Sequence, residues 1–179
     1  MTRFRIVPDE SEVDLEGHTS VHPLHGKAGS LTGMIDVEIG PDGLPDLSRP
    51  YAAQLSLPAT AITWGGPIYD RETHRRLDVR RYPTITASVE EAFLDEENQQ
   101  FDLRIKLTLH GQTRLIEGEA AVRVESRRMT IEGKRVLDIR EFGLAPPRLL
   151  MLKVEPLVTV HARIVAAAEA GSATVNGAG

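Results

Sequence analysis

The chain has 179 residues, a formal net charge of −5 and no cysteine. This length suffices for one domain with a full core, and the absence of cysteine excludes disulfides, thiolate metal sites and cysteine nucleophiles. The acidic balance argues against nucleic-acid binding, and an aromatic content of 4% is too low for base-stacking platforms. No apolar run approaches the length of a transmembrane segment, and the charged N-terminus lacks the apolar core of a secretory signal. We therefore expect a cytoplasmic protein.

Apolar and polar residues alternate with a period of two along most of the chain, which is typical of strands with one buried face. In chain order, the alternating segments are 12–16, 35–39, 54–61, 84–90, 101–110, 120–125 and 158–164. Turn-like sequences of hairpin length separate several of them, which favours an antiparallel meander. About seven or eight strands follow from this pattern. A sheet of that size tends to close into a barrel, because closure removes its exposed edges.

The segment 67–81 breaks the alternation. Tyr69, Thr73 and Leu77 stand at helical spacing, and Asp70 is placed to cap the start, so we predict a short helix here. A lone helix in a meander often covers one end of the barrel.

This segment is also basic. It contains five arginines, namely Arg71, Arg75, Arg76, Arg80 and Arg81. Arginine suits phosphate and carboxylate groups, so the segment could meet an anionic head group, or it could be a solvated face paired with its own carboxylates. The Ala-rich and Gly-rich residues 169–179 are expected to form a disordered tail after one barrel domain at 1–168.

Three histidines, His18, His22 and His25, lie close together in the sequence. On a helix they could bind zinc, but Gly17 and Pro23 oppose a helix. We expect an irregular crossing or bulge between two strands, and no metal site.

His110 precedes Gly111 between two strands, and the sequence offers no nucleophile elbow, phosphate-binding loop or dinucleotide fingerprint. We expect a turn there and no catalytic residue.

The inward faces use many small residues, including Ala59, Ala61, Ala87, Ala120 and Ala162. Since an eight-stranded barrel can hold one small ligand, an interior poor in bulk and charge predicts an apolar cavity, which suits an elongated lipid. The alternative is two flattened sheets whose core is filled by Leu, Ile and Val.

Three segments in this order carry a family resemblance: Tyr82-Pro83-Thr84-Ile85, Leu107-Thr108-Leu109-His110-Gly111-Gln112-Thr113 and Arg140-Glu141-Phe142-Gly143-Leu144. With them, roughly residues 4 to 166 resemble the YceI-like family, whose members are lipocalin-like barrels that bind polyisoprenoid or other long amphiphilic molecules. The resemblance implies an all-β, antiparallel eight-stranded lipocalin-like barrel with one short helix. It brings no catalytic residues and no cofactor, and it allows a homodimer.

The resulting hypothesis is a protein that binds, stores or carries an isoprenoid quinone, a polyprenyl lipid or another amphiphile in the barrel, without catalysis. The residues predicted to line the ligand site are Leu15, Ile35, Val37, Leu55, Leu57, Ile85, Leu103, Ile105, Leu107, Val122, Val124, Phe142, Val158 and Val160. Two alternatives remain open. One is a solid barrel that serves as a protein interaction module, and the other is an enzyme that uses the barrel as a substrate pocket, with one of the four histidines above in its chemistry.

Overall fold

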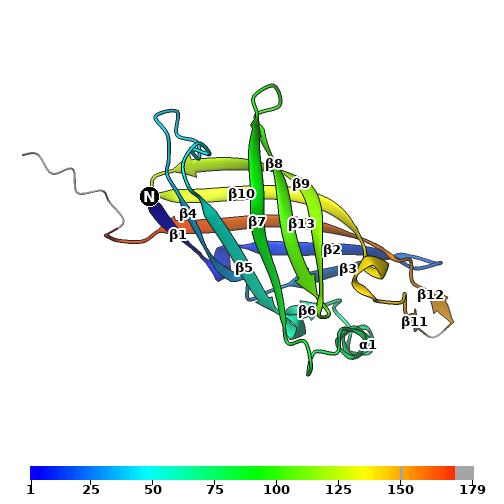
Figure 1. Cartoon of the computed structure of the whole chain (residues 1–179). Helices are drawn as coiled ribbons and strands as arrows, with labels where there is room; N and C mark the ends of the chain where they lie inside the picture. The colour runs from blue at the N-terminus through cyan, green and yellow to red at the C-terminus, as the bar shows by residue number, and fades with distance from the viewer. Residues whose placement is uncertain (150, 172–179) are drawn as a thin grey trace, which may run out of the picture.

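The computed structural model describes residues 1–149 and 151–171, which form a β-barrel with one α-helix and short 3₁₀ turns (Figure 1). The strands are β1 (Thr2–Ile6), β2 (Glu12–His18), β3 (Pro23–Ala28), β4 (Thr32–Val37), β5 (Ala52–Pro58), β6 (Ile62–Thr63), β7 (Thr84–Asp95), β8 (Gln100–Leu109), β9 (Gln112–Glu125), β10 (Arg128–Asp138), β11 (Arg148–Leu149), β12 (Leu152–Lys153) and β13 (Leu157–Ala168). The helical elements are η1 (Pro8–Glu10), η2 (Ala59–Ala61), α1 (Pro67–Leu77) and η3 (Ile139–Phe142).

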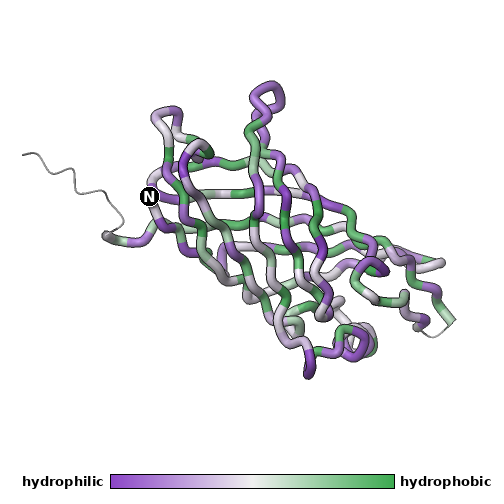
Figure 2. The backbone as a smooth tube through the Cα atoms, viewed as in Figure 1, coloured by the Kyte–Doolittle hydropathy of each residue, from purple (hydrophilic) through white to green (hydrophobic). Residues whose placement is uncertain are grey.

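Eight antiparallel strands close the barrel in the order β1-β4-β5-β7-β8-β9-β10-β13, and β13 pairs back with β1. Phe4 illustrates the closure, since it lies opposite Ile35 on one side and Ala168 on the other. Apolar and polar residues alternate along the strands (Figure 2), so that successive side chains point into the barrel and out to solvent. The predicted fold class, an all-β eight-stranded barrel with one short helix, is confirmed.

One edge of β13 pairs with two strands in succession, β2 and then β1. Between these two strands, Pro8 begins η1 and supplies no backbone N–H to the sheet. Ser11 secures the break, because its hydroxyl donates to the Val7 carbonyl at 2.9 Å and accepts from the Val165 N–H at 3.0 Å. Beyond β2, the sheet continues through β3 and β6.

Three local expectations are wrong. The stretch 18–25 is not an irregular crossing but the β2–β3 hairpin, with His18 opposite Pro23. The alternation that predicts a strand through residue 61 ends at Pro58, after which the chain turns into η2. Asp70 does not cap α1, because Gly66 holds the N-cap position. The Asp70 carboxylate instead accepts a hydrogen bond from the backbone N–H of Trp64 at 2.5 Å.

The two ends of the barrel differ. The mouth end, as we call it, carries α1, η3, the β8–β9 turn and the β11–β12 hairpin (Figure 1). The far end carries the N-terminus, the loop between β4 and β5, and the β7–β8 turn (Figure 1). The helix therefore lies at one end of the barrel, as expected of a lid.

The three family-like segments meet at the mouth end. The Nδ1 atom of His110 lies 3.2 Å from the Phe142 carbonyl oxygen, and the His110 ring packs edge-on against Tyr82 with the ring centroids 5.3 Å apart. Gly111 suits this corner because its φ is +69° and a Cβ there would lie 2.5 Å from the Tyr82 ring. The turn predicted at His110 is confirmed.

The last barrel strand ends at Ala168, and the barrel domain at 1–168 stays a prediction. Most of the predicted tail, from residue 172 onward, lies outside the described residues. No helix in the described part of the chain has the length and apolar character that a membrane span requires.

Candidate ligand-binding cavity

The far half of the barrel interior is filled by a packed core. Phe4, Met129 and Ala166 are at most 2% exposed, and Ile35 and Ile164 pack with them. Ile35 and Ile164 also belong to the wall of a cavity on the mouth side of this core. The core therefore forms the floor of that cavity.

The mouth half of the barrel encloses a cavity of about 430 Å³. This volume lies within the range of about 300–1,000 Å³ that small-molecule pockets occupy. The wall is almost entirely apolar and is built by the strands from β2 to β10 together with β13. One face of α1 completes it with Tyr69, Thr73 and Leu77, the residues whose spacing predicts the helix. A hollow interior of this size argues against the solid-barrel alternative.

The structure places most of the predicted lining residues around this cavity. The ten that lie in its wall are Leu15, Ile35, Leu55, Leu57, Ile85, Leu103, Ile105, Leu107, Val158 and Val160. Val37, Val122 and Val124 belong instead to the packed core of the far half. Phe142, which is 0% exposed, packs with Leu77 in a small core at the mouth end. The three valines therefore lie at a level of the barrel where the interior is filled, and Phe142 lies on η3, outside the barrel strands.

Trp64 is a wall residue that is absent from the predicted lining set. It is the single tryptophan of the chain, and it lines the cavity between β6 and α1. Its ring packs so closely on β3 that a Cβ on Gly26 would lie 2.6 Å from it. The hydrogen bond from its N–H to Asp70 fixes its backbone to α1. No sequence periodicity marks Trp64, because it lies in the short link between β6 and the helix.

The cavity remains open because small residues stand where larger ones would fill it. Gly118, Ala120 and Ala162 all belong to the wall. A Cβ added to Gly118 would meet no atom within 4 Å. The inward position of Gly118 on β9 is therefore empty space that a larger side chain would occupy.

A seam between β9 and β10 opens the wall sideways. The two strands pair from Glu125 opposite Arg128 to Ala120 opposite Gly133. Toward the mouth, residues 112–119 pair only with β8, and 134–138 pair only with β13, among the residues described here. The cavity wall includes residues on both edges of this seam, Gly118 and Glu119 on one side and Lys134 and Arg135 on the other. Since Glu119, Lys134 and Arg135 are exposed, the cavity reaches the surface here.

The few charged residues of the wall lie toward the mouth. Arg76 of α1 is one of them, and its Nε donates to the Glu72 carboxylate at 2.8 Å. Arg75 donates to the same carboxylate at 2.8 and 3.0 Å. These hydrogen bonds lower the pKa of Glu72 to about 2, and the bonds from Arg75 contribute more than the bond from Arg76. Glu72 thereby neutralises part of the basic helix.

The histidines of the enzyme hypothesis do not meet at the cavity, and none of them is in its described wall. His18 lies 3.5 Å from Glu16, and His22 faces the Pro23 carbonyl oxygen at 3.0 Å. Among the described residues, no group of three or more His, Asp or Glu side chains is close enough to hold a metal ion. His110 is occupied by its contacts with Phe142 and Tyr82.

An antiparallel eight-stranded barrel with an apolar cavity at one end defines a lipocalin-like barrel protein. The family model of the YceI-like domain matches residues 4–166. The chain therefore belongs to the YceI-like family, and the resemblance noted in the sequence is confirmed. No curated protein shows significant sequence similarity to this chain.

Solved structures show the same fold at low sequence identity. The crystal structure of BcnA from Burkholderia cenocepacia has a TM-score of 0.74 and 15% identity, covering 89% of this chain and 98% of that one. A polyisoprenoid binding domain from Saccharophagus degradans, implicated in plant cell wall breakdown, has a TM-score of 0.73 and 15% identity, covering 93% and 98%. The YCEI protein of Campylobacter jejuni has a TM-score of 0.65 and 12% identity, covering 86% and 89%. At these identities the likeness establishes the fold alone.

Proposed function

We propose that this protein binds, stores or carries a long apolar or amphiphilic molecule, an isoprenoid quinone or a polyprenyl lipid, without changing it chemically. The observation that carries the proposal is the apolar cavity of about 430 Å³ between the packed core and the mouth. Membership of the YceI-like family and the polyisoprenoid binding domain of similar fold support a ligand of this class. The cytoplasmic location and a homodimer stay predictions.

The position of the cavity, between the packed core and the mouth, suits a chain-like ligand. Its tail would lie among Leu55, Ile105 and Val160, with its end on the packed core. Burial of apolar surface contributes about 25 cal/mol per Å², so a few isoprene units would offset the entropic cost of binding. The polar head would remain at the mouth, where the charged wall residues lie. We expect an affinity of about 1 µM or tighter.

Native mass spectrometry of the purified full-length chain, followed by solvent extraction and lipid identification, tests the proposal directly. We expect about one quinone or polyprenyl molecule per chain, and the same spectrum reports whether the chain is a dimer. A ligand-free mass that persists after incubation with polyprenyl lipid would contradict the proposal and favour a protein interaction module.

A further inference from the structure

The mouth end carries most of the exposed apolar side chains. Among the described residues, the large apolar side chains that are exposed at this end are Val21, Ile68, Leu115, Val136, Met151 and Leu157. The other two exposed ones are Met1, at the N-terminus, and Phe93, near the end of β7 that leads into the β7–β8 turn, so both lie at the far end. Exposed apolar residues gathered in this way mark a contact surface more often than scattered ones do.

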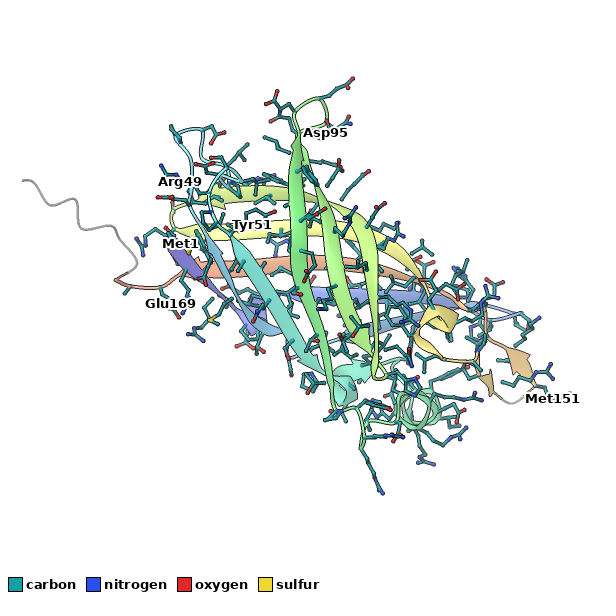
Figure 3. The ribbon with its side chains drawn as sticks, viewed as in Figure 1. Met1, Arg49, Tyr51, Asp95, Met151 and Glu169 are labelled. Atoms are coloured by element: carbon teal, nitrogen blue, oxygen red, sulfur yellow. The ribbon has the colours of Figure 1, made fainter. Side chains whose placement is uncertain are left out.

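Two of these side chains stand at the tips of adjoining hairpins. Val21, in the β2–β3 turn, is 72% exposed, and Met151, between β11 and β12, is 100% exposed. Met151 projects from the end of the molecule opposite Asp95 and Arg49 (Figure 3). The Ser20 N–H donates to the Lys153 carbonyl at 2.9 Å, so the two hairpins hold each other in place.

The two ends also differ in charge. The mouth end presents exposed cations that form no ion pair within the described part of the chain, namely Arg71, Arg80, Arg81, Arg148 and Lys153. The far end presents acidic residues in its loops, namely Asp42, Asp46, Asp95, Glu96 and Glu97. The exposed carboxylates of Glu141 and Glu155 also lie at the mouth end, but these cations outnumber them, so an anionic surface would attract this end more strongly than the far end.

From these observations we propose that the protein docks by its mouth end onto a bilayer that contains anionic lipids. Val21 and Met151 would insert between head groups, and Arg71, Arg80 and Arg81 would face the lipid phosphates. Cationic and apolar residues on one surface are the combination that binds membrane interfaces. An acidic protein would satisfy the arginines, but the exposed apolar residues lie on separate hairpin tips and strand ends. Such an arrangement suits insertion between lipid head groups better than a continuous protein interface of roughly 800 Å² per partner.

This docking goes beyond the carrier role and does not depend on which ligand fills the cavity. Docking by this end would also bring the seam between β9 and β10, through which the cavity reaches the surface, close to the bilayer. A lipid could then move between the membrane and the cavity without crossing water.

Flotation of the full-length protein with isoprenoid-free vesicles tests the docking. The vesicles contain phosphatidylcholine alone, or with about one third phosphatidylglycerol to supply anionic charge. We expect the protein to float only with the anionic vesicles and to be released as the salt rises to about 0.5 M. Failure to float with anionic vesicles at low salt would overturn the proposal. So would binding of a polyglutamate peptide but not of vesicles, which would favour an acidic protein partner.

Two sets of variants test which side chains form the docking surface. The double variant Val21→Asp with Met151→Asp replaces the apolar side chains at the hairpin tips. The triple variant Arg71→Gln with Arg80→Gln and Arg81→Gln removes the cations. Each set should weaken vesicle binding about tenfold or more. Phe93→Asp is the matched control, because Phe93 is 61% exposed but lies on β7 near the far end, and it should bind as the unchanged protein does. Equal losses in the control and the tip variant would refute docking by the mouth.

The two proposals fail separately. A protein that extracts with a bound isoprenoid but never floats would be a carrier without this docking surface. One that floats but carries no lipid would keep the docking and lose the carrier role. Circular dichroism of each variant ensures that a loss of flotation does not come from unfolding.

Discussion

At the scale of single residues, Gly118 determines how much of the barrel is hollow. It belongs to the cavity wall, and a Cβ there would meet no atom within 4 Å. A larger residue would also suit a strand better than glycine does. Gly118→Phe should therefore fill part of the cavity and abolish isoprenoid binding while leaving the urea midpoint unchanged or slightly higher.

Trp64 provides the measurement, because the single tryptophan of the chain lines the same cavity. Added quinone should quench its fluorescence in the unchanged protein and not in Gly118→Phe. Glu117→Phe is the control, since Glu117 is the exposed neighbour on the same strand and its side chain points outward. Quenching of Gly118→Phe equal to that of the unchanged protein would show that the ligand lies elsewhere.

Glu72 gives the basic helix a measurable pH dependence. Its pKa falls from 4.5 to about 2 because Arg75 and Arg76 donate to its carboxylate. A group whose pKa is lowered by folding stabilises the fold fully above its unfolded value, and that stability is lost as the pH falls toward the folded value. The free energy of unfolding should therefore differ most between the unchanged protein and Glu72→Gln above about pH 5. The difference should shrink between pH 4.5 and 2.

Urea unfolding of both proteins at pH 6.5 and pH 2.5 checks this prediction. Arg75→Gln combined with Arg76→Gln is the matched variant, because it removes the donors and should lose the same pH dependence. A difference between Glu72→Gln and the unchanged protein that is equal at both pH values would be incompatible with the ion pairs seen here.

The sequence could predict which side chains point inward, but not the level of the barrel at which each one lies. Alternation selects Leu103 and Val122 by the same rule, yet Leu103 faces the cavity and Val122 packs against the far core. Their levels follow from strand register and from which neighbours are glycine or alanine. Both are properties of the closed barrel and not of any one segment, so the predicted lining set mixes wall residues with core residues.

At the scale of elements, the β8–β9 turn organises the mouth. His110 and Gly111 both have positive φ, 54° and 69°, as a tight hairpin requires. Gly111→Ala should cost about 1–2 kcal/mol from its backbone alone. It should cost about 1–3 kcal/mol more because the added Cβ pushes on a packed side chain, here the Tyr82 ring at 2.5 Å.

Gly43→Ala separates these two costs. Gly43 has a φ of +80°, and a Cβ there would meet nothing within 4 Å. It should therefore show only the backbone penalty of about 1–2 kcal/mol, measured by urea unfolding beside Gly111→Ala. Equal destabilisation of the two variants would mean that the contact with Tyr82 contributes little to the mouth.

The elements themselves were predictable to different degrees. The long strands and the helix have clear periods. The helix predicted within 67–81 forms, but it ends at Leu77, and residues 78–81 are a turn. The β2–β3 hairpin was missed because histidine, glycine and proline interrupt its pattern. The short strands β6, β11 and β12 have two residues each, which is too few for an alternation of apolar and polar residues to be recognised. The β2–β3 hairpin and these short strands, which complete the mouth end, are therefore the elements that the sequence predicts least well.

At the scale of the whole molecule, the barrel divides into a packed far half and an open mouth half. The closed order of strands follows from the number of strands and their short connections, so it could be predicted. The division could not, because it arises where β9 and β10 separate beyond Ala120 and Gly133. A stable far half allows the mouth half to remain hollow and partly unpaired.

This division predicts an uneven pattern of hydrogen exchange. On β9, the amides of 120–125 that face β10 lie in a paired strand, whereas those of 112–119 that point to the seam have no strand partner among the described residues. Peptides covering 112–119 and 134–138 should exchange faster than those covering 2–6 and 164–168, since local opening needs less free energy where ladder bonds are missing.

Ligand binding provides the second half of the test, because residues on both edges of the seam belong to the cavity wall and residues 2–6 do not. Mass spectrometry of exchanged peptides, with and without polyprenyl lipid, should show added protection at 112–119 and none at 2–6. Gly118→Phe should show no response to lipid, which separates binding from a general effect of the amphiphile. Uniform slow exchange along β9, or lipid protection confined to the far half, would show that the seam is not where the cavity opens.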